Sequence, residues 1–174
     1  MQSPAWMLIP VAAVISTSAY ATTYLTAEQA QAAIFPGATL TAAPMTLTPE
    51  QKSAIEKKSG VNVLKKEVQL WKTGDGGYFI VDEVVGKHEF FTIAVGLKND
   101  GSVKQIEILD YRETYGYQVH EEAWRRQFVG KTSADHLKLT DDIKNIGGAT
   151  LSCKHVTDAV KRLLATYDIA LKST

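Results

Sequence analysis

Residues 89–111 read EFFTIAVGLKNDGSVKQIEILDY, and this stretch decides the class of fold. In its first half, large apolar residues occupy every second position: Phe91, Ile93, Val95 and Leu97. The tripeptide Asn99-Asp100-Gly101 is typical of a tight hairpin turn. A second run follows at 103–111, where Ile106 and Ile108 face the same way. The stretch therefore predicts two antiparallel strands that share one buried face.

Two more strands are predicted upstream of this hairpin. Residues 61–72 alternate roughly between apolar and polar side chains and end at the glycine-rich turn 74–77. Residues 78–85 form the next apolar run, and Gly86-Lys87 turns the chain into the following strand. Because turns this short join antiparallel neighbours, the four runs predict a β-meander.

Helices are predicted on both sides of the meander. Thr26 opens a capping box at the start of a first helix. Thr48 is the N-cap of a second helix, Pro49 takes its first position, and this helix ends near residue 60. Residues 119–128 and 150–171 are predicted as two further helices. The last helix carries one apolar stripe: Val156, Ala159, Val160, Leu163, Leu164 and Tyr167. Helices flanking an antiparallel sheet predict an α+β fold, with a long C-terminal helix after a Gly-Gly-Ala-Thr turn.

The composition excludes several classes of protein. The chain has 174 residues, 45% of them hydrophobic, which suits one globular core. Its 19 Lys and Arg balance 19 Asp and Glu, so no net field favours nucleic acid. Cys153 is the only cysteine, which excludes an internal disulfide, and the four histidines lack ligand spacing, so we predict no metal site. No Ser-His-Asp elbow, P-loop or dinucleotide-binding glycine motif is present.

The first 21 residues contain no charged side chain and end in Ala19-Tyr20-Ala21, a small-x-small pattern typical of signal-peptidase sites. We interpret residues 1–21 as a signal peptide and expect a periplasmic protein, either free or associated with a membrane. An uncleaved membrane anchor is the alternative, although the apolar run is short and contains Pro10. Residues 22–60 are then an N-terminal helical segment, and residues 61–174 form the main domain.

The segment Gly147-Gly148-Ala149-Thr150-Leu151-Ser152 precedes the last helix. Its small residues allow close approach of another molecule, and the helix N-terminus favours a phosphate next to the Thr150 hydroxyl. The alternative is that Thr150 is an ordinary N-cap. A second Gly-Ala-Thr occurs at Gly37–Thr39, but Pro44 makes a helix starting at Thr39 improbable, so we predict no phosphate site there.

Three segments of the second half of the chain form a recognisable set: Gly148-Ala149-Thr150, the loop Glu113-Thr114-Tyr115-Gly116, and the run of Trp124, Phe128, Gly130 and Lys131. Together they resemble the FMN-binding domain family, and the resemblance covers roughly residues 78–165. The family includes flavin subunits of sodium-pumping NADH:quinone reductases and of Rnf-type complexes. It implies an FMN joined through its phosphate to Thr150. The implied cofactor-binding residues are Gly147, Gly148, Ala149, Thr150, Leu151, Ser152, Glu113, Thr114, Tyr115, Gly116, Trp124 and Lys131.

Several of these residues have more than one interpretation. Tyr115, Tyr117 and Trp124 are candidates for the apolar wall of a flavin site or for core packing. Lys131 either balances the phosphate charge or lies in solvent. Cys153 is expected to be a small buried apolar residue rather than a reactive thiol. His155 is expected to be structural or on the surface rather than a donor to the flavin.

The resemblance and the predicted signal peptide together imply an exported electron-transfer flavoprotein, in which the flavin carries the redox chemistry and no side chain is catalytic. It also implies a flavin transferase that uses FAD and magnesium, and a membrane or periplasmic redox partner such as a quinone-linked reductase or a cytochrome. Lys144 and Gly147 replace the acid and the Ser or Thr of the usual attachment signal, which keeps open a scaffold module without flavin. A small flavin enzyme is a third alternative, for which the sequence shows no substrate pocket outside the flavin loop.

Overall fold

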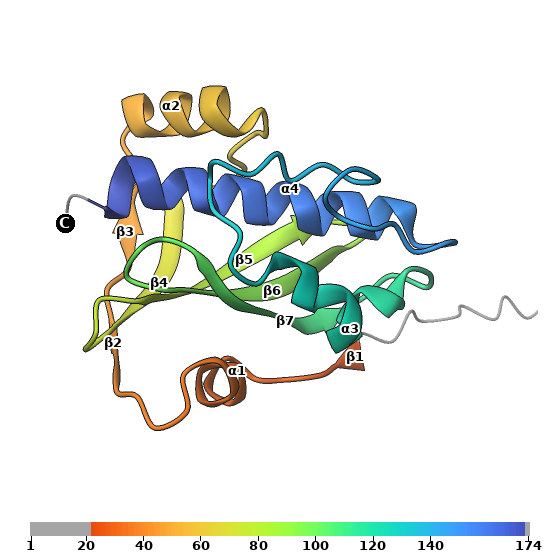
Figure 1. Cartoon of the computed structure of the whole chain (residues 1–174), viewed down its shortest axis with the longest axis horizontal. Coiled ribbons are helices and arrows are strands. Elements are labelled where there is room, and N and C mark those ends of the chain that lie inside the picture. Colours follow the sequence, from red (N-terminus) through yellow and green to blue (C-terminus); the bar gives the residue numbers. More distant parts are fainter. Residues whose placement is uncertain (1–21, 173–174) are drawn as a thin grey trace, which may run out of the picture.

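The computed structural model describes residues 22–172, and these form an α+β fold around one antiparallel sheet (Figure 1). The sheet has the strand order β1-β7-β6-β5-β4-β2, and β3 pairs with β4 outside this path. Its strands are β1 (Thr22–Thr23), β2 (Leu40–Ala42), β3 (Met45–Thr46), β4 (Glu67–Thr73), β5 (Tyr78–Val85), β6 (Phe90–Leu97) and β7 (Val103–Tyr111). The proposed signal peptide lies outside the described residues.

Helices cover both faces of the sheet. They are α1 (Ala27–Ile34), α2 (Pro49–Ser59), a 3-10 turn (Tyr117–His120), α3 (Glu122–Arg125), a second 3-10 turn (Arg126–Phe128) and α4 (Thr150–Thr166), which continues as a π-helical turn (Tyr167–Leu171). Figure 1 shows α4 across one face, α1 against the other face, and α2 stacked on α4. Within residues 22–172, no helix combines the length and apolar character needed to span a membrane.

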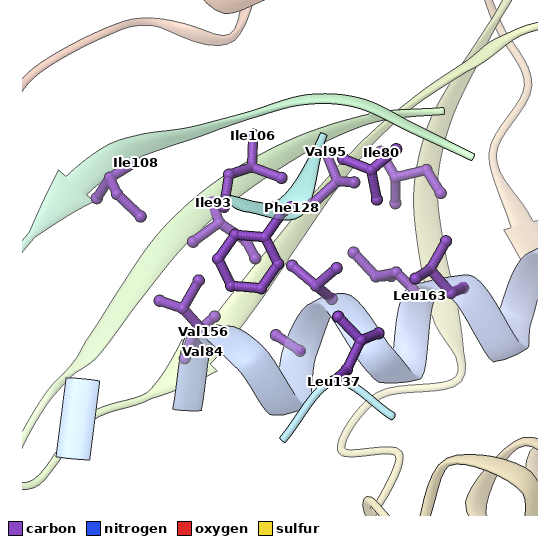
Figure 2. Close-up of a cluster of buried hydrophobic side chains, with 14 of the residues drawn as sticks. Ile80, Val84, Ile93, Val95, Ile106, Ile108, Phe128, Leu137, Val156 and Leu163 are labelled. Carbon is purple, nitrogen blue, oxygen red and sulfur yellow. The ribbon is translucent and has the colours of Figure 1, made fainter. Parts of the chain in front are cut away.

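The main core lies between the sheet and α4. The alternating apolar residues of β5, β6 and β7 meet Val156, Val160 and Leu163 of α4, and Phe128 lies among them (Figure 2). A second cluster packs α1 against Phe79 on the opposite face, and a third joins α2 to the end of α4. All residues of the predicted apolar stripe of the last helix are buried. The prediction that this face of the helix packs into the core is therefore confirmed.

The meander follows the prediction closely where the hydrophobic period is regular. The bounds of β5 and β7 are those predicted, and the capping box of α1 forms as expected. Thr48 is the N-cap of α2 as predicted, and it forms a capping box with Gln51 as well. The register between β6 and β7 shifts at Gly96 and Leu97. At this bulge the buried positions of β7 skip from Val103 to Ile106. The alternation with a period of two resumes at Ile106.

Two predicted elements are wrong in extent. Residues 61–66 precede β4 instead of belonging to it, because side chains bind their backbone: Val63 N–H donates to Glu56 Oε1 at 2.8 Å, and Asn62 O accepts from Arg162 Nη1 at 3.2 Å. The helix predicted at 119–128 is interrupted at Glu121, which has extended backbone angles. Arg125 Nε donates to His120 O at 2.8 Å and holds this break.

The N-terminal segment is not only helical. Three short strands, β1, β2 and β3, add to the sheet edges from residues 22–46. Each has two or three residues, which is too few for a hydrophobic period to be visible in a sequence.

Candidate functional site

The start of α4 presents free hydrogen-bond donors. Gly148 turns the chain with φ of 81°, a left-handed conformation that a side chain disfavours, and Ala149 is the N-cap. The first helical hydrogen bond runs from Cys153 N to Ala149 O at 2.9 Å, and within the described residues no side chain caps the helix. The amide groups just before that bond therefore point outward, together with the positive end of the helix dipole.

Thr150 is the first residue of α4, and its side chain is exposed. Its Oγ1 accepts a hydrogen bond from Asn145 Nδ2 at 2.9 Å instead of capping a backbone amide. The alternative that Thr150 is an ordinary N-cap is therefore wrong, because Ala149 holds that position. The hydroxyl of Thr150 stands beside the uncapped helix end and is open to chemistry.

The loop after β7 is fastened to the first turn of α4. Tyr111 OH donates to Tyr115 O at 2.6 Å and lies 2.7 Å from Ser152 Oγ. A phenol carries one proton, so Ser152 is the donor in this second contact. Gly116 has φ of 89°, and a Cβ there would lie 2.3 Å from Ser152 Oγ. The loop and the helix can meet this closely only because residue 116 is glycine.

Glu113 fastens the same loop to the β5–β6 turn. Its Oε1 accepts from His88 N at 2.6 Å and from Glu89 N at 3.0 Å. Desolvation raises the pKa of Glu113, but the backbone donors of His88 and Glu89 outweigh it and hold the pKa below its usual range. Glu113 thus binds the backbone of a neighbouring turn and not that of its own loop.

These three segments enclose a cavity of about 450 Å³, within the size range of small-molecule sites. The lining residues are Lys87, His88, Glu113, Thr114, Tyr115, Gly148, Ala149, Thr150, Leu151 and Ser152. Tyr115 is 80% exposed and Leu151 is 47% exposed, so both offer apolar surface at the rim. The cavity therefore combines a helix N-terminus, the cationic side chain of Lys87 and exposed apolar groups.

Lys87 and His88 were missed by the sequence reasoning. The predicted topology could have indicated them, because the turn after β5 and the C-terminal end of β7 lie at the same end of the strands in an antiparallel meander. The loop that starts at Glu113 must then come close to that turn.

Four predicted site residues do not line the cavity. Gly116 and Gly147 lie next to it in the chain but contribute no surface. Trp124 is buried, donates from Nε1 to Lys144 O at 2.7 Å and packs edge-on against Phe128. Lys131 Nζ pairs with Asp142 at 3.1 Å and with Asp135 at 3.3 Å. Trp124 therefore packs in the core, which was one of its two interpretations. The charge of Lys131 is neutralised by aspartates of the same segment, residues 131–146, which connects the second 3-10 turn to α4.

The remaining candidates lie outside the cavity. Cys153 is buried, and burial raises the pKa of its thiol, which suits the predicted inert residue. Tyr117 is half exposed and does not line the cavity. His155 lines a different cavity. In the described part of the chain, no cluster of His, Cys, Asp or Glu is large enough to hold a metal ion.

Comparison with known families agrees with this geometry. Residues 86–165 match the model of the FMN-binding domain family, a span that holds every residue lining the cavity. Residues 86–165 belong to the FMN-binding domain family. This FMN-binding domain comprises β6, β7, the loop after β7 and most of α4. No match was found among curated proteins.

The residues present fit FMN. The uncapped end of α4 supplies amide donors suited to a phosphate. Lys87 adds a cation, and Tyr115 adds a flat face at the rim. The chain thus contains an FMN-binding domain, which indicates a flavin-binding role.

Proposed function

We propose that the protein is an exported electron-transfer flavoprotein whose FMN is esterified through its phosphate to Thr150. The observation that carries the proposal is the exposed Thr150 hydroxyl at the uncapped N-terminus of α4, on the wall of the cavity. The second Gly-Ala-Thr offers no such environment, because Thr39 precedes strand β2.

Each wall of the cavity has a part in holding the cofactor. The amides of the first turn of α4 and the side chain of Lys87 bind the phosphate. Tyr115 and Leu151 cover part of the ring system, and Glu113 keeps the β5–β6 turn in place. The bound flavin supplies the electron chemistry, while the protein positions it and limits its contact with water.

Attachment needs a donor that the family resemblance implies, namely FAD with magnesium and a flavin transferase. The Thr150 oxygen attacks the phosphorus next to the flavin, the bond to the adenylate breaks, AMP leaves, and the hydroxyl proton is released. A tethered cofactor suits an exported protein, since a dissociated flavin would be lost from the compartment, whereas a tether keeps its local concentration high. We propose that the redox partner is a membrane or periplasmic protein, such as a quinone-linked reductase or a cytochrome.

The test is in-gel flavin fluorescence after expression of the chain with an active flavin transferase. Wild type is expected to give a fluorescent band on a denaturing gel, Thr150→Val none, and Thr39→Val a band like wild type. Intact mass of the three chains should show the same pattern, with one FMN added less one water. Equal fluorescence of all three would exclude Thr150, and loss in Thr39→Val alone would move the site to the first copy.

A second candidate is supported by Lys144 and Gly147, which depart from the usual attachment signal. In this candidate the domain binds FMN without a covalent bond, or serves as a scaffold without flavin. Visible absorbance of the native and the denatured, filtered protein separates the cases. Colour that stays with the denatured chain contradicts this candidate, colour that is lost on denaturation supports non-covalent binding, and a colourless native protein supports the scaffold.

A further inference from the structure

The side chain of Asn145 reaches forward along the chain to the hydroxyl of Thr150. Its Nδ2 donates to Thr150 Oγ1 at 2.9 Å, and both residues are exposed. The first copy of Gly-Ala-Thr has no such contact, because among residues 22–172 the Thr39 hydroxyl has no side-chain donor. We propose that Asn145 orients the Thr150 hydroxyl for attack on phosphorus and stabilises the charge that develops on its oxygen. This role rests on the proposed function.

The hydrogen bond selects one orientation of the Thr150 hydroxyl. A hydroxyl has one proton and two lone pairs, and the Asn145 amide occupies one of these lone pairs. The second lone pair is left for attack on a phosphorus held in the cavity that Thr150 lines. A helical threonine without such a donor tends to bind a backbone carbonyl of the preceding turn instead. Asn145 therefore keeps the hydroxyl away from this competing contact.

The same hydrogen bond acts on the charge of the reacting oxygen. In the attachment step the Thr150 oxygen forms a bond to the phosphorus next to the flavin of FAD. The bond from this phosphorus to the adenylate breaks, AMP leaves with the electron pair, and the hydroxyl proton is released. Negative charge develops on the oxygen as its proton is lost, and a donor already in place stabilises that charge without rearrangement. The amides of α4 bind the phosphate, whereas Asn145 acts on the nucleophile.

The backbone on both sides of Asn145 is fixed, although its side chain is exposed. On one side, Lys144 N donates to Gln127 Oε1 at 2.7 Å, and Lys144 O accepts from Trp124 Nε1 at 2.7 Å. On the other side, Ile146 O accepts from the amide of the N-cap residue of α4 at 3.0 Å. The side chain of Asn145 therefore starts from a backbone that is already in place, which reduces the entropy lost in orienting the hydroxyl.

Gln127 has a part in this arrangement as a positioning residue. Its Nε2 donates to Trp124 O at 2.9 Å, so its Oε1 is the atom that faces Lys144 N. Gln127 contacts neither Thr150 nor the cavity, and it can influence attachment only through the backbone that carries Asn145.

The hydrogen bond itself is tested by NMR of the full chain, labelled with ¹⁵N and without FMN. The side-chain amide signals of Asn145 should move in Thr150→Val, which removes the acceptor, and stay near their wild-type positions in Thr150→Ser, which keeps it. The side-chain signals of Asn99, which is exposed in the β6–β7 turn, should not move in either variant. Unchanged Asn145 signals in Thr150→Val would overturn the inference, whether or not the chain accepts FMN.

The role in attachment is tested by the rate at which an active flavin transferase modifies the purified chain with FAD and magnesium. Asn145→Ala should lower kcat at least about tenfold and leave the KM for the chain near that of wild type, because the contact strengthens only as charge develops. Asn145→Asp has the same shape without a donor and should be at least as slow, since its carboxylate also repels the phosphate. Asn145→His restores a donor and should recover part of the rate. Asn99→Ala is the control and should react like wild type.

Wild-type rates in Asn145→Ala or Asn145→Asp would overturn the inference while the proposed function stands. A wild-type chain that accepts no FMN from an active transferase would instead contradict the proposed function, and the role of Asn145 with it. Fluorescence titration of FMN separates orientation of the hydroxyl from shaping of the cavity. Among chains that carry Thr150→Val, addition of Asn145→Ala should leave FMN affinity unchanged, and a clear loss would overturn the inference.

A double-mutant cycle tests whether Gln127 acts through Asn145. Gln127→Met, which loses the acceptor of Lys144 N, should slow attachment, whereas Gln127→Glu keeps the acceptor and should slow it less. In the Asn145→Ala background, Gln127→Met should have no further effect. Additive losses in the double variant would contradict the assignment of Gln127 as a positioning residue.

Discussion

The tripeptide Gly-Ala-Thr occurs in two regions of this molecule with opposite surroundings. At residues 37–39 it precedes β2, a three-residue edge strand that pairs with β4. At residues 148–150 it starts α4, beside a cavity with walls from three segments. Both threonines are exposed, and both glycines have positive φ. The sheet places β2 far from the start of α4 (Figure 1).

The difference teaches that the tripeptide alone carries no chemistry. Exposure of a hydroxyl is common to both copies, whereas the uncapped helix end, the neighbouring Lys87 and the fastened loop belong only to the second. Changes that dismantle these surroundings should make Thr150 behave like Thr39.

The largest effect is expected from Gly116→Ala. The new Cβ would lie 2.3 Å from Ser152 Oγ in a backbone conformation with φ of 89°, at a cost of about 3 kcal/mol. The loop should detach from α4, and FMN binding should weaken at least about tenfold. Fluorescence titration of FMN against chains that also carry Thr150→Val measures binding without the covalent bond.

Gly130→Ala is the matched control for that change. Gly130 has φ of 79°, a Cβ there meets nothing within 4 Å, and the residue does not line the cavity. Its substitution should lower stability and leave FMN affinity near that of wild type. Equal loss of affinity in both variants would mean that backbone strain, and not the fastened loop, controls binding.

A smaller effect is expected from the matched pair Gly148→Ala and Gly37→Ala. Each glycine has positive φ and open space around its missing Cβ, so each substitution should lower the free energy of unfolding by about 1–2 kcal/mol. Thermal denaturation should show similar losses. Only Gly148→Ala should reduce the yield of fluorescent protein on a denaturing gel. An equal reduction in Gly37→Ala would contradict the claim that only the second copy of Gly-Ala-Thr depends on its surroundings for attachment.

The smallest effect is expected from the acid titration of Glu113. Since the folded-state pKa is lowered, the carboxylate stabilises the β5–β6 turn above its unfolded pKa of about 4.3, and this contribution is lost as pH falls through the folded value. Hydrogen exchange at the His88 and Glu89 amides should therefore lose protection below about pH 4.3 in wild type.

In Glu113→Gln the same amides should be less protected at neutral pH, by about 1 kcal/mol, and should show no change across the acid range. Unchanged protection in this variant at every pH would show that the hairpin itself, without Glu113, orders the turn that contributes Lys87 to the cavity.

The sequence predicted what depends on local period and capping. β5 and β7 have the expected bounds, because their apolar residues alternate between two turn signals, and α4 begins at Thr150 after the glycines. The prediction of one continuous helix at 119–128 was wrong. The apolar spacing of this segment looks helical, but the side chain of Arg125 binds His120 O and the helix is broken there. No local pattern encodes that contact.

The candidate site was predictable in its chain-local parts and not in its tertiary ones. Residues 113–115 and 148–152, which the resemblance implied as cofactor-binding, line one cavity. Trp124 and Lys131 match the same family pattern, yet they bind Lys144 O and two aspartates in the connector. A motif marks which residues recur, and only the fold decides which of them face a ligand.

The walls of the cavity come from three stretches, near residues 87, 114 and 150, that are far apart along the chain. An unfolded polypeptide carries both copies of Gly-Ala-Thr but has no pocket at either. Only after the meander closes and α4 docks do the two threonines differ. Cofactor attachment at Thr150 would therefore report on the completeness of folding. A partly folded chain would not receive FMN from the transferase.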